Sequence, residues 1–150
     1  MAYGDRHLQR ESNRGPVAGS YQSFTLQALT VGAGSTDLYI GEIKLPFICR
    51  VMEIAAGNLT SVGGASRGTF QVTDGTNDLI DVDKLMTSAD SVIVTPTSAT
   101  SKLVAAQRTR AKGDKLKLFV TTVAAEVVTS LTVTITVWVQ DHVVADEADD

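Results

Sequence analysis

Length, composition and charge restrict this chain to a small number of protein classes. The 150 residues, of which 43% are hydrophobic and 20% charged, suit one ordinary domain with a buried core. Two His and one Cys exclude a disulfide framework and a Cys/His zinc site, and the formal net charge of −4 argues against a general affinity for nucleic acid. The 18 Val, 18 Thr and 7 Ile favour pleated strands over helices, so we expect an all-β protein.

Residues 1–22 are expected to form an extended N-terminal arm. The segment contains Arg6, Arg10 and Arg14 but shows no hydrophobic periodicity, so it cannot offset its own ordering entropy and should become ordered only against a partner. It also lacks the apolar core of a signal peptide, and no stretch of the chain approaches the roughly 20 apolar residues of a membrane span. We therefore expect a soluble protein that is made in the cytoplasm and does not bind membranes.

A β-sandwich domain is predicted for residues 23–140. Short runs of alternating polarity are separated there by turn residues at intervals of about ten, the pattern of a sandwich or barrel. Turns are expected at Asp74-Gly75 and Lys112-Gly113-Asp114, and the longest loops at residues 57–68 and 88–101. One helical turn is an alternative for residues 83–89. The expected strands, about eight, cover residues 23–31, 37–44, 48–55, 67–73, 78–82, 102–106, 115–122 and 131–140.

The strand predicted over residues 131–140 has the clearest alternation. One face carries Leu131, Val133, Ile135, Val137 and Val139, and the other carries Thr132, Thr134, Thr136 and Trp138. In the preceding strand, Leu116, Leu118 and Val120 alternate with Lys115, Lys117 and Phe119, whereas the pattern of residues 48–54 leaves open which face is buried. A large aromatic residue on the Thr-bearing face indicates that a neighbouring subunit covers it. The predicted subunit-interface residues are Trp138, Thr136 and Phe119.

Few residues in this chain suit catalysis or metal binding. His7 lies in the arm and His142 begins the tail, so neither is expected on a rigid element, and Cys49 within a strand is expected to be a structural thiol. One carboxylate cluster suggests calcium, but its spacing does not match an EF-hand, so turn-forming and solvent-facing aspartates are favoured: Asp74, Asp78, Asp81 and Asp83. We predict no catalytic residue, cofactor or metal.

Two further charged segments stand out in the second half of the chain. A basic group is expected to be a solvated surface in preference to a site for an anion or an acidic partner: Arg108, Arg110, Lys112, Lys115 and Lys117. Residues 141–150 form an acidic tail with five acids and no base.

Residues 38–140 carry an ordered series of strand and turn signals. An apolar-Pro-Phe sequence lies within Gly41-Glu42-Ile43-Lys44-Leu45-Pro46-Phe47-Ile48-Cys49-Arg50-Val51, and a strand ends at a Gly turn in Gly68-Thr69-Phe70-Gln71-Val72-Thr73-Asp74-Gly75. A Gly-Asp turn follows in Ala111-Lys112-Gly113-Asp114-Lys115-Leu116-Lys117-Leu118, and the alternating final strand includes Leu131-Thr132-Val133-Thr134-Ile135. In this order the signals resemble the small jelly-roll structural proteins of tailed bacteriophages, specifically the capsid decoration, or cement, proteins.

The resemblance implies a fold and a function. The fold would be a jelly-roll-like antiparallel β-sandwich of about eight strands with an extended N-terminal arm. The protein would bind the major capsid protein on the outside of the assembled virion, as a homotrimer at three-fold positions, and stabilise the capsid. The arm would reach across capsid subunits, with Arg6, Arg10, Arg14 and Tyr21 as capsid-binding residues. The acidic tail departs from the family pattern, which leaves its role open.

Two other classes of function are alternatives. The first is a phage tail or fibre module, or another carbohydrate-binding β-sandwich, that uses exposed aromatics and loops to bind a host surface glycan. The second is a hydrolase with a carboxylate pair such as Asp81 and Asp83, which would need a cleft. Glycan binding would separate the first alternative from a decoration protein.

Overall fold

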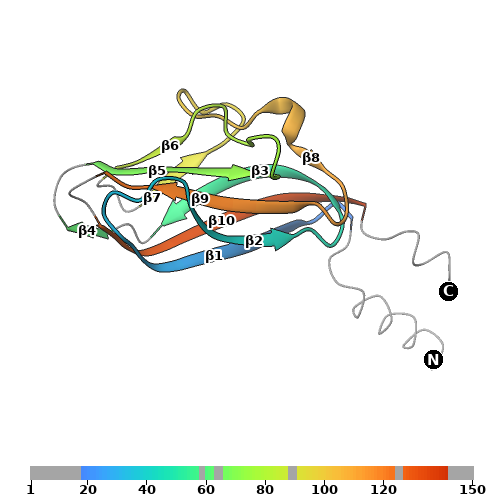
Figure 1. The fold of residues 1–150 in the computed structure, drawn as a ribbon. Helices are drawn as coiled ribbons and strands as arrows, with labels where there is room; N and C mark the ends of the chain where they lie inside the picture. Colours follow the sequence, from blue (N-terminus) through green and yellow to red (C-terminus); the bar gives the residue numbers. More distant parts are fainter. Residues whose placement is uncertain (1–17, 58–59, 63–65, 88–90, 124–126, 142–150) are drawn as a thin grey trace, which may run out of the picture.

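The computed structural model of this chain is a sandwich of two antiparallel β-sheets, seen as two layers in Figure 1. It describes residues 18–57, 60–62, 66–87, 91–123 and 127–141. Sheet A has the strand order β1 (Tyr21–Val31), β10 (Val127–Asp141), β3 (Ile48–Gly57) and β7 (Ser91–Val94), with β4 (Thr60–Val62) beside β10 and β8 (Thr109–Arg110) beside β3. Sheet B has the order β2 (Leu38–Lys44), β9 (Lys115–Thr121), β5 (Ser66–Thr73) and β6 (Lys84–Thr87).

The pairing of strands is that of a jelly roll. The first strand, β1, pairs with the last, β10, and the second, β2, pairs with the next to last, β9. Further inward, β10 pairs with β3 and β3 with β7 in sheet A, while β9 pairs with β5 and β5 with β6 in sheet B. This is the order produced when one long antiparallel ribbon rolls into two facing sheets. The prediction of an all-β antiparallel sandwich is confirmed.

The core forms where the alternating strands face each other between the sheets. The apolar faces of β9 and β10 are buried as the alternation predicts, with Leu116, Leu118, Leu131, Ile135 and Val137 all at 1% exposure or less. Phe70 of β5 and Ile54 of β3 are the largest side chains that join them from neighbouring strands. Because each sheet contributes one apolar face, the opposite faces of both sheets are left for solvent or partners.

A β-bulge in β3 explains why its sequence did not reveal the buried face. Val51 pairs with Val137 of β10, but the next pair joins Glu53 to Thr136, so Met52 is an extra residue on the β3 side. The bulge shifts the alternation by one residue. Cys49 and Val51 face the core before it, and Ile54 faces the core after it.

Residues 78–82 and 102–106 were predicted as strands and are not. They form only isolated bridges, Thr73 with Asp78 and Ile80 with Leu103, and residues Ala105–Gln107 form a 3₁₀ turn. The physical reason is a side chain that takes the place of a neighbouring strand. The Gln71 amide donates to the Ile80 carbonyl at 2.9 Å and accepts from the Ile80 N–H at 3.0 Å, which satisfies the backbone of this buried residue without a ladder.

Strands β6 and β7 lie where the sequence predicted a helical turn and a long loop. Residues Lys84–Thr87 pair with β5, so the helical alternative for that segment is wrong, and Ser91–Val94 pair with β3. Both strands have only four residues and lie at the edges of their sheets. Such short edge strands depend on the neighbour that they pair with, because a four-residue sequence carries little periodicity of its own.

The two ends of the sandwich domain lie side by side. Strand β1 begins at Tyr21, two residues before the predicted range, and the backbone continues the pairing: the Gly19 N–H donates to the Val139 carbonyl at 2.7 Å, and the Val139 N–H donates to the Ser20 carbonyl at 2.8 Å. Strand β10 ends at Asp141. The chain therefore joins the sandwich and leaves it at the same end, the right-hand end of Figure 1.

A substitution at Gly68 tests whether the backbone of β5 has to approach the end of β9 closely. Its φ of +100° suits glycine, and a Cβ atom there would overlap the carbonyl oxygen of Thr121. We expect Gly68→Ala to lower the free energy of unfolding by about 3 kcal/mol or more, from backbone strain and overpacking together. Urea denaturation measures this change. Gly57→Ala is the matched control, since nothing lies within 4 Å of its Cβ position, and an equal loss in both variants would contradict the explanation.

Candidate interaction surfaces

An aromatic pair lies at the end of the sandwich where the chain enters and leaves. Tyr21 and Trp138 are cross-strand partners whose ring centroids are 4.7 Å apart at 70°, an edge-to-face arrangement. Tyr21 is 62% exposed and Trp138 is partly buried, with Arg50 of β3 as its partner on the other side. The structure thus brings together a residue predicted to bind the capsid and one predicted to lie at a subunit interface.

Hydroxyl side chains cover the sheet A surface next to this pair. Ser23 and Thr136 have their hydroxyl oxygens 3.3 Å apart, and Thr25 and Thr134 have theirs 3.4 Å apart. Both pairs lie on the outer face because their neighbours Phe24 and Ile135 point to the core. Thr136 therefore shares one surface with Trp138, and we call this outer face of sheet A, from Tyr21 and Trp138 to Thr25 and Thr134, the hydroxyl face.

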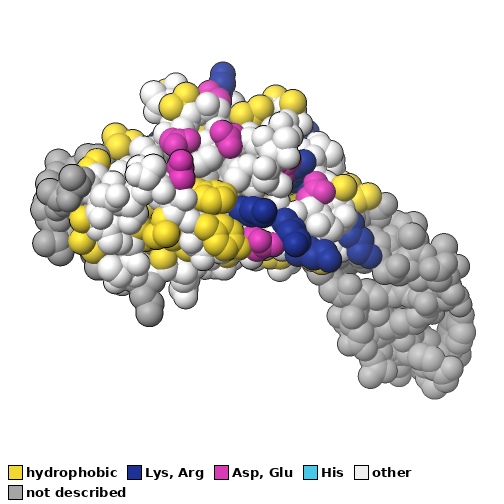
Figure 2. Space-filling view, in the orientation of Figure 1, with side chains coloured by type: hydrophobic (Ala, Val, Ile, Leu, Met, Phe, Trp, Pro, Cys, Tyr) yellow, Lys and Arg dark blue, Asp and Glu magenta, His cyan; other side chains and the backbone are white. Residues whose placement is uncertain are grey.

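Sheet B carries a different outer surface, which faces the viewer in Figure 2. Tyr39 of β2 and Phe119 of β9 are cross-strand partners with ring centroids 5.6 Å apart. The Tyr39 hydroxyl donates to Glu42 Oε1 at 2.8 Å, which raises the pKa of the tyrosine and lowers that of the glutamate. Lys115 Nζ lies 3.6 Å from the same carboxylate. We call this side of the sandwich the aromatic face.

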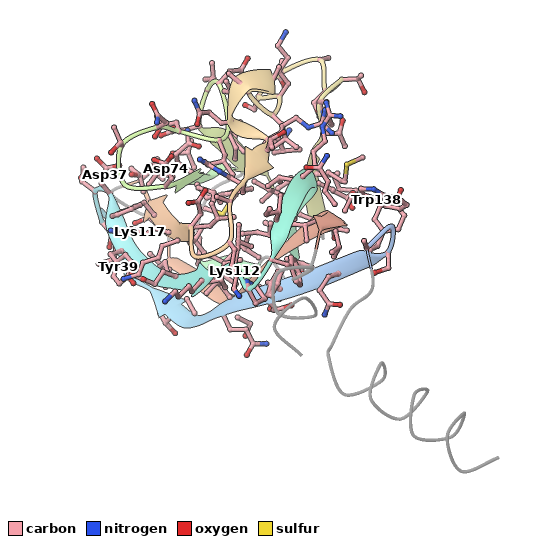
Figure 3. All side chains as sticks on the ribbon, turned by 90° about the vertical axis from the view of Figure 1, so that its right-hand side faces the viewer. Asp37, Tyr39, Asp74, Lys112, Lys117 and Trp138 are labelled. Atoms are coloured by element: carbon pink, nitrogen blue, oxygen red, sulfur yellow. The ribbon has the colours of Figure 1, made fainter. Side chains whose placement is uncertain are left out.

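The three predicted interface residues do not form one patch. Trp138 and Thr136 belong to the hydroxyl face of sheet A, whereas Phe119 belongs to the aromatic face of sheet B. Figure 3 shows Trp138 on one side of the molecule and Tyr39 and Lys117 on the other. In a cyclic trimer each contact joins two different patches, one from each subunit. The hydroxyl face of one subunit would therefore have to contact the aromatic face of the next.

The aromatic face also contains a shallow pocket of about 420 Å³. Its lining residues come from β5, β9, the segment before β2 and the segment after β5: Asp37, Gln71, Thr73, Asp78, Asp83 and Phe119. Gln71 is only 8% exposed and donates to Asp83 Oδ1 at 2.8 Å, which holds that carboxylate at the pocket wall. Asp37 is held by a backbone N–H bond of 2.9 Å to Thr121 Oγ1, which in turn donates to Asp37 Oδ1.

Two arginines of the predicted basic group are structural. Arg110 is 13% exposed at its side chain and lies 3.1 Å from both Asp74 and Asp114, so it joins β8 of sheet A to the turns at the ends of β5 and β9 in sheet B. Arg108 donates to the Val51 carbonyl at 2.9 Å, and burial lowers its pKa. The expectation of a solvated surface is therefore wrong for these two residues.

The lysines of the basic group are distributed over the surface instead. Lys115 and Lys117 extend from β9 on the aromatic face, and Lys112 with Lys44 lines a separate pocket of about 490 Å³ beside Leu45, Pro46 and Gly113. Figure 2 shows Lys and Arg atoms beside the hydrophobic atoms near the centre of this face.

The aspartates of the predicted acidic cluster do not form one site, and three of them accept structural hydrogen bonds. Asp74 accepts the backbone N–H groups of Thr76 at 2.8 Å and Asn77 at 2.6 Å, as a turn-forming aspartate does. Asp81 accepts from the Val82 and Lys102 N–H groups, and Asp83 accepts from Gln71. Within the described ranges, no group of three or more His, Cys, Asp or Glu is arranged to hold a metal ion.

The remaining predicted residues divide into one that is buried and several that are not described. Cys49 is a free thiol inside the core, and burial raises its pKa to about 11, so it stays protonated and unreactive at neutral pH. Arg6, Arg10, Arg14, His7 and His142 lie outside the described residues.

A scan against protein-family models and a search of curated protein sequences found no match for this chain. Of the residues that the structure describes, none belongs to a helix long and apolar enough to cross a membrane.

Sequence reasoning did not identify the pocket on the aromatic face. Its residues come from segments that are far apart along the chain: 34 positions separate Asp37 from Gln71, and 36 positions separate Asp83 from Phe119. Their proximity depends on the order β2-β9-β5, which is a tertiary property. The only local signal was the alternation of β9, which places Phe119 on the same outward face as Lys115 and Lys117.

Asp74 gives a test of pH dependence. Hydrogen bonds from the Asn77 and Thr76 backbone and from Arg110 lower its pKa from 3.8 to about 2 in the folded protein. Because the folded pKa lies below the unfolded one, its stabilisation is present above about pH 4 and is lost as the pH falls towards 2. We expect Asp74→Asn to be less stable than the parent protein by about 1 kcal/mol at pH 7 and equally stable near pH 2.

Urea unfolding of both proteins at a series of pH values measures this difference. Asp74→Ala is the companion variant, because it also removes the acceptor of the turn and should lose stability at every pH. A constant difference between the parent protein and Asp74→Asn from pH 7 to 2 would refute the assignment.

Trp138 and Phe119 allow the two faces to be tested separately as subunit interfaces. If Trp138 is covered by another subunit, Trp138→Ala should weaken self-association by about 2–4 kcal/mol, the range of an interface anchor. Phe119→Ala reports in the same way on the aromatic face. Sedimentation velocity over a concentration series gives the oligomeric state, and circular dichroism checks that each variant is folded. An unchanged oligomer in a folded Trp138→Ala protein would exclude the hydroxyl face.

Proposed function

We propose that this chain is a structural virion protein that binds the outside of an assembled phage capsid and stabilises it. It would act as a homotrimer at three-fold positions, with the major capsid protein as its partner. The observation that carries the proposal is the convergence of the chain ends. Because β1 begins where β10 ends, residues 1–17 and 142–150 both join the sandwich at the end that carries Tyr21 and Trp138.

The convergence of the chain ends supports separate roles for the sandwich, as a folded unit, and for residues 1–17, as the attachment segment. The described sandwich has its own core, and the strands described in its two sheets lie within residues 21–141. Residues 1–17 contain three arginines and no core-forming pattern, so a partner would have to provide the energy that orders them. Arginine forms paired hydrogen bonds with carboxylates, which gives such an arm a means of attachment to acidic groups on a capsid surface.

The jelly-roll order of strands is compatible with this role. Jelly rolls occur in viral capsid domains and also in lectins, so the fold agrees with the proposal but does not select it. A trimer with three arms would gain avidity, since the second and third attachments become intramolecular. Binding to the assembled shell and not to free capsid subunits would then stabilise the shell by mass action.

Removal of residues 2–17 tests the arm as the attachment element. We expect the truncated protein to remain folded, because Gly19, Ser20 and Tyr21, which pair with β10, are kept. Its affinity for undecorated heads should fall at least tenfold, which is about 1.4 kcal/mol per site. A cosedimentation titration against heads, with circular dichroism as the check on folding, measures both properties.

A matched variant separates the arginines from the length of the arm. Replacement of Arg6, Arg10 and Arg14 by Gln keeps every residue of the arm and removes its three positive charges. Removal of residues 142–150 is the control at the same end of the sandwich. Equal occupancy of heads by the truncated and complete proteins would mean that the sandwich itself is the anchor, and it would refute this mechanism.

A further inference from the structure

The pocket on the aromatic face combines features that capsid attachment by the arm does not use. It is open to solvent, one wall is Phe119, whose ring lies 5.6 Å from that of the exposed Tyr39, and its other walls are carboxylate, amide and hydroxyl groups. Figure 2 shows the hydrophobic atoms near the centre of this face with Asp and Glu atoms close by. An apolar ring next to convergent hydrogen-bonding groups is the usual composition of a small-ligand site.

We propose that this pocket is a glycan-binding site for sugars that are neutral or carry an amine. The apolar face of a pyranose ring would pack against Phe119, with the Tyr39 ring at the rim. The hydroxyl groups of the sugar, or its amine, would donate to the carboxylates of Asp78 and Asp83. This binding would be separate from attachment to a capsid, because it uses sheet B and not the end of the sandwich that carries the arm.

The Asp83 carboxylate is held before any ligand arrives. The buried Gln71 donates one amide hydrogen to the Ile80 carbonyl and the other to Asp83 Oδ1, so Asp83 is fixed relative to β5. The backbone of Asp78 is held by an isolated bridge with Thr73, whose hydroxyl donates to the Asn77 carbonyl, and its side chain is exposed. A carboxylate fixed in the way that Asp83 is fixed loses little entropy on binding, which favours a weak ligand such as a sugar.

The charge of the pocket determines which sugars it would accept. Three of its six lining residues are aspartates, Asp37, Asp78 and Asp83, and none is a lysine or arginine. A uronic acid or a phosphorylated sugar would place like charges close together in this pocket. A neutral sugar avoids that repulsion, and the ammonium group of glucosamine would be attracted by the carboxylates and by the aromatic ring.

Gln71 has the role of a positioning residue in this proposal. Both hydrogens of its amide and its carbonyl oxygen are already engaged by the protein, so it would act on a ligand only through Asp83. Tyr39 is similarly oriented by the bond from its hydroxyl to Glu42.

The test uses the full chain, free of capsids, and defined tetrasaccharides as probes. Nuclear magnetic resonance titrations would compare cellotetraose and the glucosamine tetramer with the galacturonic acid tetramer. We expect the first two to bind and to shift the signals of Phe119, Gln71 and Asp83, and the acidic tetramer to bind at least tenfold more weakly. Absence of binding by both the neutral and the amine-bearing probe at millimolar concentration would overturn the proposal, as would equal binding of the acidic one.

Variants on the two faces locate the site. Phe119→Leu keeps an apolar side chain but removes the ring, and Asp78→Asn removes one charge; each should weaken binding of the glucosamine tetramer at least fivefold. Tyr21→Leu is the matched control, because Tyr21 is an exposed aromatic residue on the other sheet. This variant should bind the glucosamine tetramer as the parent protein does. An equal loss in the Tyr21 variant would place any sugar binding elsewhere. Since no heads are present, failure here leaves capsid binding by the arm unaffected, and the reverse also holds.

Discussion

The position of β10 between β1 and β3 is the constraint on which the rest of the structure depends. This strand has 15 residues, and its inner face supplies a continuous row of buried side chains from Leu131 to Val139. Its outer face consists of Thr and Trp, so only one orientation of the strand buries the apolar row. Once this orientation is set, the first and last strands are neighbours, and both chain ends lie at the same end of the sandwich.

Different side chains provide polar partners at the two sheets. In sheet A, Arg110 on β8 forms ion pairs with Asp74 and Asp114 beside sheet B, and in this way it joins the sheets at one end of the sandwich. In sheet B, the Gln71 side chain replaces a missing strand for Ile80 and holds Asp83 at the surface. Removal of the Gln71 amide would leave the backbone of the buried Ile80 without these two hydrogen bonds, and removal of Arg110 would leave Asp74 and Asp114 without their ion-pair partner.

The consequence for function is that the molecule presents three distinct surfaces. The aromatic face with its pocket is separated from the hydroxyl face by the thickness of the sandwich, whereas the hydroxyl face adjoins, through Tyr21 and Trp138, the end where residues 1–17 join the sandwich. A molecule that attaches through the end of the sandwich leaves the aromatic face accessible. The proposed attachment of the arm to a capsid and the proposed glycan site are therefore physically compatible, whereas self-association through Trp138 would use a surface next to the chain ends.

The sequence by itself determined the class of fold, because alternation with a period of two is a local property that a single strand expresses alone. This is why the faces of β9 and β10 and the turn at Asp74 could be predicted from residues and their neighbours. Tertiary structure alone decided the phase of β3, the edge strands β6 and β7, and the segment around Ile80. In each of these the pairing partner, through a bulge, a neighbouring strand or the Gln71 amide, outweighs a weak local pattern. The pocket on the aromatic face belongs to the second group, since its residues meet only when β2, β9 and β5 align, and no local pattern encodes which strands become neighbours.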